Sequence, residues 1–329
     1  MGCYAACQLF SQNAVKTSVF KKNLISMKNI LIAGGTGLVG NRLSQLLRGQ
    51  GYTVFHLSRR ENLKAEFPAY AWDVEKQTID LKAIQQADYI INLAGSGIAD
   101  KRWTAARKKD IIESRVHAAL LLKHALDNTL HHVKAYISAS AMGFYGDRDN
   151  ELLDENAEQG TGFLAECTSI WENAIAEVAK TGIRTVAFRI GVVMSTKGGA
   201  LQKMLIPFMF RLGVYFGNGK QWYSWIHIDD LCGMFIWAIE NEKATGVYNA
   251  VAPTPLSNYD LTAAISKAKG GGYLLVPVPA FALRIGMGEM TDAVLNSTHC
   301  VSQKIENQGF IFKFPEAVAA FKDLFERKI

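Results

Sequence analysis

The chain has 329 residues, 49% of them hydrophobic and 20% charged, which is typical of a globular protein with enough apolar mass for a large core. Its formal net charge is +6, and the basic residues are scattered along the chain. No nucleic-acid-binding motif accompanies them, so we expect no nucleic-acid partner. No apolar run reaches the roughly 20 residues of a membrane span, so we expect no membrane association, and the five dispersed cysteines define neither a disulfide framework nor a metal site.

Residues 1–26 differ from the rest of the chain because they contain Lys, Ser and Thr but no Asp or Glu. That composition resembles a weak organellar transit peptide. The alternative, which we favour, is an upstream start codon with Met27 as the functional start, since Met27 directly precedes a well-formed strand. We therefore expect a cytoplasmic protein, or an organellar one if residues 1–26 are a transit peptide.

Short apolar runs and helical patterns alternate along the first 200 residues. The runs predict strands at 30–33, 53–57, 89–94, 134–138 and 184–193, and the patterns between them predict helices at 38–47, 104–126 and 163–180. This alternation predicts an α/β fold with a Rossmann-type, doubly wound parallel sheet. After Pro207 the rhythm breaks into loops and short helices, which predicts a smaller C-terminal substrate lobe.

The same pattern divides the chain into four segments. Residues 1–26 are the leader or upstream extension, 27–200 mainly the Rossmann domain, 201–276 a mixed lobe with returning Rossmann elements, and 277–329 a small C-terminal domain. Within the third segment, the run from Trp225 to Asp230 is typical of a loop entering a helix, with Asp229 or Asp230 as the N-cap. We expect a structural role for His227 in this run.

A glycine-rich turn follows the first predicted strand and opens the first predicted helix. It reads Gly34-Gly35-Thr36-Gly37-Leu38-Val39-Gly40. Glycines at positions 34, 37 and 40 permit a tight turn, a close approach of the backbone to a pyrophosphate, and close helix–strand packing, while the helix N-terminus attracts phosphates. The turn therefore predicts a dinucleotide site formed by these seven residues.

The end of the second predicted strand indicates which dinucleotide binds there. It reads His56-Leu57-Ser58-Arg59-Arg60, with no acid to hold the ribose hydroxyls of NAD. A hydroxyl at Ser58 and a guanidinium at Arg59 suit the 2′-phosphate of NADP(H), because arginine pairs bidentately with phosphate. The alternative is that Arg59 and Arg60 belong to a solvated loop.

Further landmarks in the same order make the chain resemble a known family. The run Asn92-Leu93-Ala94-Gly95 and the run Ser138-Ala139-Ser140 with Tyr145-Gly146 are similar to those of extended short-chain dehydrogenases/reductases. Finer matches resemble the atypical "epimerase family protein" subgroup, whose members are described as NAD-dependent epimerase/dehydratase-like or NADP-dependent oxidoreductases: Arg102-Trp103, Glu113-Ser114-Arg115, Trp171-Glu172, Gly198-Gly199-Ala200 and Trp225–Asp230. The segment from about Pro277 resembles the small C-terminal domain of that subgroup.

The resemblance implies a path for the cofactor. The pyrophosphate would lie on the Gly34–Gly40 turn and the adenosine phosphate near Ser58 and Arg59, and the cofactor would pass over Leu93, Ala94 and Gly95. Arg115 would reach the cofactor from the side, and Val193 would lie near the nicotinamide. For Arg115 the alternative is a surface ion pair with a neighbour such as Glu113.

The usual catalytic pair of short-chain dehydrogenases is missing, because no tyrosine has a lysine four residues later. The predicted helix from Phe163 carries Leu164 and Thr168 where tyrosine and lysine would stand. Ser140, after a strand end, could bind a carbonyl or alcohol, and Tyr145 could act as an acid. The alternative for Tyr145 is a packed aromatic in its turn.

Two classes of function remain from these residues. One is an NADP(H)-dependent oxidoreductase or epimerase acting on a small polar, sugar-nucleotide-like molecule, and we favour it because Ser140 and an elaborate second lobe are present. The other is a non-catalytic NADP(H)-binding sensor or interaction protein, favoured by the missing pair. The sequence specifies neither the substrate nor the assembly state, and a homodimer is left open.

Overall fold

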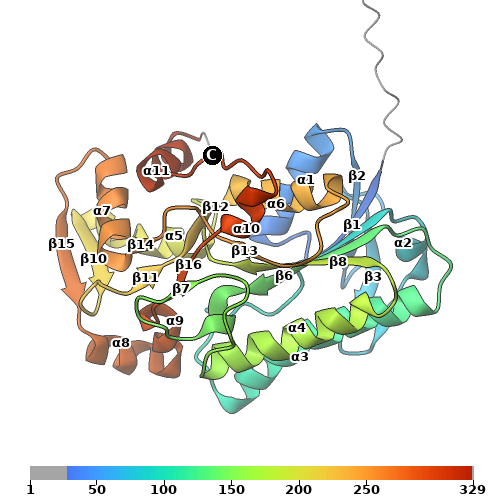
Figure 1. The fold of residues 1–329 in the computed structure, drawn as a ribbon, viewed down its shortest axis with the longest axis horizontal. Helices are drawn as coiled ribbons and strands as arrows, with labels where there is room; N and C mark the ends of the chain where they lie inside the picture. Colours follow the sequence, from blue (N-terminus) through green and yellow to red (C-terminus); the bar gives the residue numbers. More distant parts are fainter. Residues whose placement is uncertain (1–27, 328–329) are drawn as a thin grey trace, which may run out of the picture.

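The computed structural model describes residues 28–327, so the predicted leader, residues 1–26, lies outside the described residues. An eight-stranded sheet crosses the molecule in the order β13-β8-β6-β5-β1-β2-β3-β4 (Figure 1). Only the outermost pair, β3 with β4, is antiparallel. The strands are β1 (Asn29–Ala33), β2 (Thr53–Ser58), β3 (Ala69–Asp73), β4 (Thr78–Ile79), β5 (Tyr89–Asn92), β6 (Ala135–Ala141), β8 (Arg184–Ile190) and β13 (Gly246–Ala250).

The central strands are apolar on both faces, as expected where helices cover both sides of a parallel sheet. Ile30, Leu31 and Ile32 of β1 have no exposed surface. The register places Ala33 beside Leu57 of β2 and Asn92 of β5. The carboxyl ends of these three strands therefore meet at one edge of the sheet, where the chain continues into the predicted cofactor residues.

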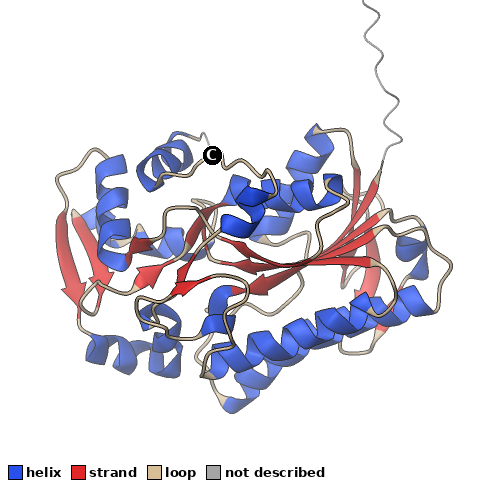
Figure 2. Cartoon of the chain, viewed as in Figure 1, coloured by secondary structure: helices blue, strands red, loops and turns tan. Residues whose placement is uncertain are grey.

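Helices form a layer on each face of the sheet (Figure 2). One face is covered by α1 (Leu38–Gly49) and α6 (Ile228–Glu240), whose apolar side chains share a core with Ile30 and Ile32. The other face is covered by α2 (Leu81–Gln85), α3 (Ala105–Asp127) and α4 (Phe163–Ala179). The predicted doubly wound α/β fold is thereby confirmed.

The smaller C-terminal lobe lies beyond the carboxyl edge of the sheet, at the left of Figure 1. Its strands form pairs instead of one sheet: β9 with β12, β10 with β15, β11 with β14, and β7 with β16. These strands are β7 (Leu152–Leu153), β9 (Val192–Met194), β10 (Leu212–Phe216), β11 (Trp222–Tyr223), β12 (Trp225–His227), β14 (Leu256–Ser257), β15 (Leu274–Val278) and β16 (His299–Cys300). The remaining helices are α5 (Gly199–Met204), α7 (Asn258–Ala268), α8 (Ala280–Met287), α9 (Asp292–Leu295), α10 (Gln303–Asn307) and α11 (Ala317–Glu326), with 3-10 turns η1 (Met142–Tyr145), η2 (Pro207–Phe210) and η3 (Gly288–Thr291).

The start of α6 differs from the expected cap. His227 is the N-cap, and its ring Nδ1 accepts a hydrogen bond from the backbone N–H of Asp229 at 3.1 Å. Asp229 and Asp230 lie in the first turn instead, where their negative charges interact favourably with the positive end of the helix dipole. The structural role expected for His227 therefore takes the form of a helix cap. Within residues 28–327, no helix combines the length and apolar character of a membrane span.

Candidate functional site

The glycine-rich turn and the end of β5 lie in direct contact. Gly34 has φ +82°, and a β-carbon there would lie 2.8 Å from the backbone carbonyl carbon of Leu93. A β-carbon on Gly40 would lie 2.4 Å from the carbonyl oxygen of Gly34. Both positions therefore require glycine, and the turn sits tightly against the segment Leu93–Gly95.

The second glycine of the turn makes room for a buried histidine. A β-carbon on Gly35 would lie 2.3 Å from Cδ2 of the His56 ring. That ring stacks on Phe67, and its Nε2 lies 2.8 Å from the Ser44 hydroxyl, which itself donates to the carbonyl of Gly40. Because the hydroxyl hydrogen is used in this way, Nε2 is the donor, and burial lowers the pKa of His56 to about 4. His56 thus supports the turn from β2.

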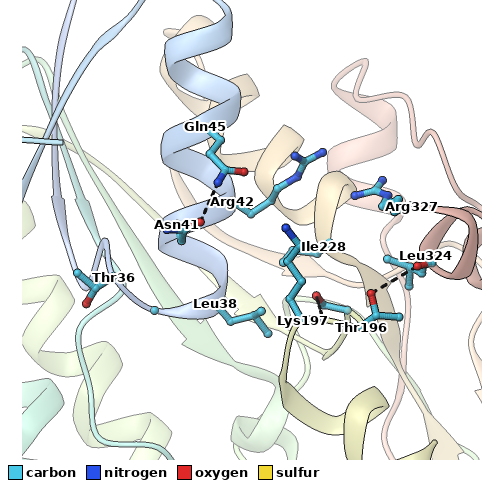
Figure 3. Close-up of a pocket in the computed structure, with 12 residues that line it drawn as sticks. Thr36, Leu38, Asn41, Arg42, Gln45, Thr196, Lys197, Ile228, Leu324 and Arg327 are labelled. Atoms are coloured by element: carbon cyan, nitrogen blue, oxygen red, sulfur yellow. Dashed lines mark hydrogen bonds between the residues drawn. The ribbon is translucent and has the colours of Figure 1, made fainter. Parts of the chain in front are cut away.

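The N-terminus of α1 is open to a ligand. Its N-cap is Gly37, and no side chain of the described residues caps it. The first turn of Leu38–Gly49 contains no acid, so its free N–H groups keep their attraction for an anion. Thr36, Gly37 and Leu38 line a cavity of about 690 Å³ (Figure 3).

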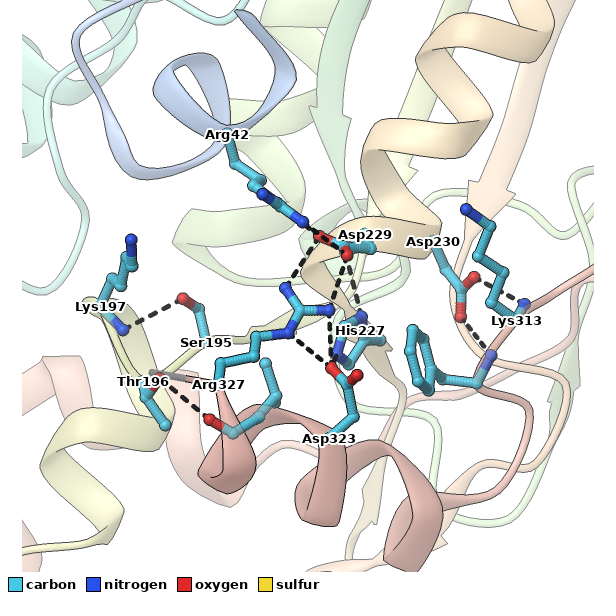
Figure 4. A network of polar contacts seen from close by, with 12 residues as sticks. Arg42, Ser195, Thr196, Lys197, His227, Asp229, Asp230, Lys313, Asp323 and Arg327 are labelled. Carbon is cyan, nitrogen blue, oxygen red and sulfur yellow. Dashed lines mark hydrogen bonds and ion pairs between the residues drawn. The ribbon is translucent and has the colours of Figure 1, made fainter. Parts of the chain in front are cut away.

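Three positive side chains from separate parts of the chain line the same cavity: Arg42 of α1, Lys197 after β9, and Arg327 after α11. None of them was identified from the sequence, because nothing in the local patterns connects these three positions. Arg42 and Arg327 both donate to Asp229, with shortest distances of 2.7 and 2.6 Å (Figure 4). Burial alone would raise the pKa of Asp229, but these hydrogen bonds outweigh burial and hold the pKa well below its usual range.

The two residues predicted for the adenosine phosphate lie where β2 ends. Ser58 is half-buried at the last position of the strand, and Arg59 follows it in an exposed position. Among residues 28–327, the Arg59 side chain has neither an ion pair nor a hydrogen-bond partner. Its guanidinium is therefore available to an anion at the carboxyl edge of the sheet.

Arg115 is buried beside Gly95 and is not on the surface. A β-carbon on Gly95 would lie 3.0 Å from Cγ of Arg115, and the guanidinium lies 5.1 Å from the ring centre of Trp171. Within the described chain its only side-chain hydrogen bond is from Nη1 to the carbonyl of Ile111 at 2.8 Å. Glu113 pairs instead with Lys109, so the expected alternative of a Glu113 ion pair is not what the structure shows. A buried guanidinium with unused donors suits an anionic ligand.

A smaller cavity of about 190 Å³ lies between the Rossmann half and the C-terminal lobe. Leu164, at the position expected for the catalytic tyrosine, lines it, whereas the Thr168 hydroxyl donates to the carbonyl of Leu164 within its own helix. Val193 itself lines neither cavity, although Val192 before it lines the smaller one and Ser195, two residues further on, lines the larger one. Of the residues predicted for the cofactor, Thr36, Gly37 and Leu38 line the larger cavity, whereas Ser58, Arg59, Arg115 and the segment Leu93–Gly95 line neither of the two.

Neither predicted catalytic residue lines the larger or the smaller cavity. Ser140 is 2% exposed, and its hydroxyl donates to Glu172 at 2.6 Å. Tyr145 has no exposed surface; its hydroxyl is within 2.7 Å of the Asn249 side-chain oxygen and accepts from Arg189 at 2.9 Å, and burial raises the pKa of the phenol. For Tyr145 the structure matches the alternative of a packed aromatic. Both residues belong to a buried network centred on the Glu172–Arg189 ion pair.

The parallel sheet and the bare, glycine-lined helix N-terminus at its carboxyl edge define a nucleotide-binding Rossmann protein. The family model described as "NAD dependent epimerase/dehydratase family" matches residues 30–250, and a domain of unknown function, DUF1731, matches residues 278–324. The chain belongs to the NAD-dependent epimerase/dehydratase family, which confirms the resemblance found in the sequence.

Relatives agree with this assignment over most of the chain. An epimerase family protein of Mycobacterium leprae is 33% identical over 284 residues, which cover 86% of this chain and 91% of the relative. The structure of the human epimerase family protein SDR39U1 (isoform 2) with NADPH is 30% identical, with a TM-score of 0.83, over 91% of this chain and all of that one. A nucleoside-diphosphate sugar epimerase from Corynebacterium glutamicum is 32% identical, with a TM-score of 0.73, over 90% of this chain and 58% of that one.

Proposed function

We propose that the protein binds NADP(H) along the carboxyl edge of the sheet and acts as an NADP-dependent oxidoreductase on a small molecule. The observation that carries the proposal is the open N-terminus of α1 after β1 together with the exposed Arg59 guanidinium after the neighbouring strand β2. The first would hold the pyrophosphate, and the second, with Ser58, the 2′-phosphate. The human relative whose structure contains NADPH supports the same choice of cofactor.

The residues present fit this cofactor in three further places. Gly37 leaves space at the turn, since a β-carbon there would meet only the carbonyl oxygen of Gly34, at 3.3 Å. Arg115 offers unused donors beside Gly95, and Val193 directly follows Val192, which lines the smaller cavity. When bound, NADPH would supply a hydride at its nicotinamide ring. The chain's own residues would orient that ring toward the smaller cavity.

The substrate expected from the sequence is a small polar, sugar-nucleotide-like molecule. The corynebacterial relative, named a nucleoside-diphosphate sugar epimerase, favours that expectation. The second candidate function, a non-catalytic NADP(H)-binding protein, is favoured by one observation. Leu164 and Thr168 supply no acid, and Ser140 and Tyr145 are buried and line neither of the two cavities. The two functions share the cofactor site and differ in turnover.

The cofactor assignment is tested by replacing Arg59 with alanine and measuring NADPH and NADH binding by calorimetry. A charge-assisted hydrogen bond to phosphate contributes about 1.5–3 kcal/mol. We therefore expect Arg59→Ala to weaken NADPH binding about 10- to 100-fold and to leave NADH binding unchanged. The control is Lys64→Ala, which removes an exposed positive charge from the same loop. Unchanged NADPH affinity in Arg59→Ala, or tighter binding of NADH than of NADPH by the wild type, would contradict the assignment.

The choice between the two functions depends on turnover. NADPH oxidation is measured with carbonyl compounds and nucleotide sugars, at enzyme concentrations high enough to detect slow reactions. Consumption of NADPH that depends on the added compound supports the oxidoreductase. Tight NADPH binding with neither consumption of NADPH by any compound nor epimerisation of any nucleotide sugar supports the non-catalytic protein.

A further inference from the structure

The smaller cavity limits what the protein can accept beside the nicotinamide. Its volume of about 190 Å³ corresponds to roughly six water molecules at their share of liquid volume. Pockets for drug-sized ligands start at about 300 Å³. The cavity thus has room for a compact group of atoms, and because it is open to solvent, a nucleoside diphosphate attached to a sugar would have to lie mostly outside it.

The charges of the side chains that line the smaller cavity favour the same kind of ligand as its volume does. No lysine or arginine occurs among the described residues that line the smaller cavity, and its ionisable members are Asp292 and Tyr223. The larger cavity, in contrast, carries Arg42, Lys197 and Arg327. A diphosphate would therefore meet a carboxylate and no cation in the smaller cavity, whereas an uncharged group would meet mainly apolar side chains such as Ile98, Leu164 and Ile190.

Two polar side chains of this lining keep unused hydrogen-bonding capacity. Thr298 is 4% exposed, and among the described residues its hydroxyl has only a weak partner, the Met142 sulfur at 3.9 Å. The side-chain amide of Asn296 has no hydrogen-bond partner within residues 28–327. By contrast, the hydroxyl of Tyr223 donates to the carbonyl of Val294 at 2.5 Å. The unused capacity therefore lies on one short loop, residues 296–298.

That loop is held firmly in place by its neighbours. The backbone N–H of Trp222 donates to the Ser297 hydroxyl at 3.0 Å, and the Ser224 hydroxyl donates to the carbonyl of Thr298 at 2.7 Å. The N–H of Thr298 donates back to the carbonyl of Trp222 at 3.2 Å. The backbone that carries Asn296 and Thr298 is thus already fixed before a ligand oxygen binds, which reduces the entropic cost of binding.

We propose that the smaller cavity binds the reacting end of a small uncharged carbonyl or alcohol compound, whose oxygen is held by Asn296 and Thr298. This inference rests on the proposed NADP(H)-dependent function and replaces the expected sugar nucleotide with a compact neutral group. It also gives the C-terminal segment matched by DUF1731 a specific task, because Asn296 and Thr298 both belong to it. These two would be substrate-binding residues supplied by that segment to the Rossmann half.

The test uses the full chain with and without NADP⁺ and measures binding of cyclohexanone, benzaldehyde and UDP-glucose by saturation-transfer NMR. We expect the two neutral compounds to bind and UDP-glucose not to bind. Thr298→Val and Asn296→Ala should each weaken binding of the neutral compounds about three- to tenfold, the loss of one hydrogen bond. Ala293→Phe, at an exposed position on the rim of the cavity, should abolish it. NADPH affinity should stay unchanged in all three variants.

Thr245→Val is the matched control, since it removes an exposed hydroxyl that lines neither cavity. Binding of UDP-glucose instead of the neutral compounds, absence of binding by all three probes, or neutral-compound binding that survives Thr298→Val and Ala293→Phe would each overturn the inference. Neutral-compound binding with the expected variant effects, but without any NADPH consumption, would uphold the cavity assignment and refute the oxidoreductase. The two failures are therefore distinguishable.

Discussion

At the scale of single residues, the nucleotide turn depends on a contact that the glycine motif does not reveal. Gly34, Gly37 and Gly40 have roles that follow from their spacing, whereas Gly35 occupies a position of the motif that any residue can fill. In this chain the His56 ring occupies the space of a β-carbon at Gly35. Because Ser44 and Phe67 hold the ring, it has little freedom to move away.

Replacing Gly35 with alanine should therefore destabilise the protein. Overpacking of a well-ordered site costs about 1–3 kcal/mol, and we expect Gly35→Ala to lower the free energy of unfolding by that amount. Urea denaturation measures the change. Gly49→Ala is the control, because a β-carbon at Gly49, the last residue of α1, meets nothing within 4 Å. Equal effects of the two substitutions would contradict the role of His56, and adding His56→Ala to Gly35→Ala should recover part of the loss.

The two predicted catalytic residues, Ser140 and Tyr145, show which feature of a site a sequence pattern does not predict. Ser140 lies near the end of β6 and Tyr145 ends the turn η1 that follows, but sequence spacing does not determine which way a side chain points. Ser140 turns toward Glu172, and Tyr145 turns toward Asn249 and Arg189. Such long-range pairings are decided by tertiary packing, so no local pattern could have shown them.

At the scale of elements, three helices meet at one carboxylate beside the larger cavity. Asp229 begins α6, Arg42 belongs to α1, and Arg327 follows α11. Arg327 also pairs with Asp323 of α11 at 2.6 Å. The C-terminal helix is thereby fixed next to the nucleotide turn, and either arginine alone can still neutralise Asp229.

This shared carboxylate predicts non-additive substitutions. Arg42→Ala and Arg327→Ala should each lower the free energy of unfolding by about 1 kcal/mol, since the partner arginine remains. The double variant leaves a largely buried carboxylate without a cation, so its loss should exceed the sum of the single losses by about 1 kcal/mol or more. A double-mutant cycle by urea denaturation measures the coupling. Additive losses would show that the two arginines act independently.

At the scale of the whole molecule, the sequence predicted most helices and strands of the Rossmann half but few of those in the second lobe. Long periodic segments such as α3 and α4 lie within two residues of their predicted bounds, because their apolar faces are buried by one regular sheet. The short β3, β4 and α2 were not predicted. Beyond Pro207, two-stranded pairs such as β10 with β15 join residues that are far apart in the chain. The local pattern of apolar residues does not predict such pairings.

Two buried histidines in different parts of the molecule make its stability depend on pH. His56 supports the nucleotide turn and His227 caps α6, and burial lowers the pKa of each to about 4 from an ordinary value of 6.5. Between these values the unfolded chain binds protons at both positions while the folded protein does not. Stability therefore falls as the pH is lowered from about 6.5 toward 4, by up to about 1.4 kcal/mol per pH unit for each histidine.

Urea denaturation at a series of pH values measures this slope. Because glutamine does not titrate, His56→Gln should reduce the change in the free energy of unfolding per pH unit by the contribution of one histidine. This holds whatever the substitution does to stability at neutral pH. His124→Gln, at an exposed position on α3, is the control and should leave the slope as in the wild type. A wild-type stability that stays constant from pH 6.5 to 4, or a slope that His56→Gln does not change, would mean that His56 takes up its proton in the folded protein. The Ser44 contact and the packing against Gly35 would then have to accommodate an imidazolium, which their buried position disfavours.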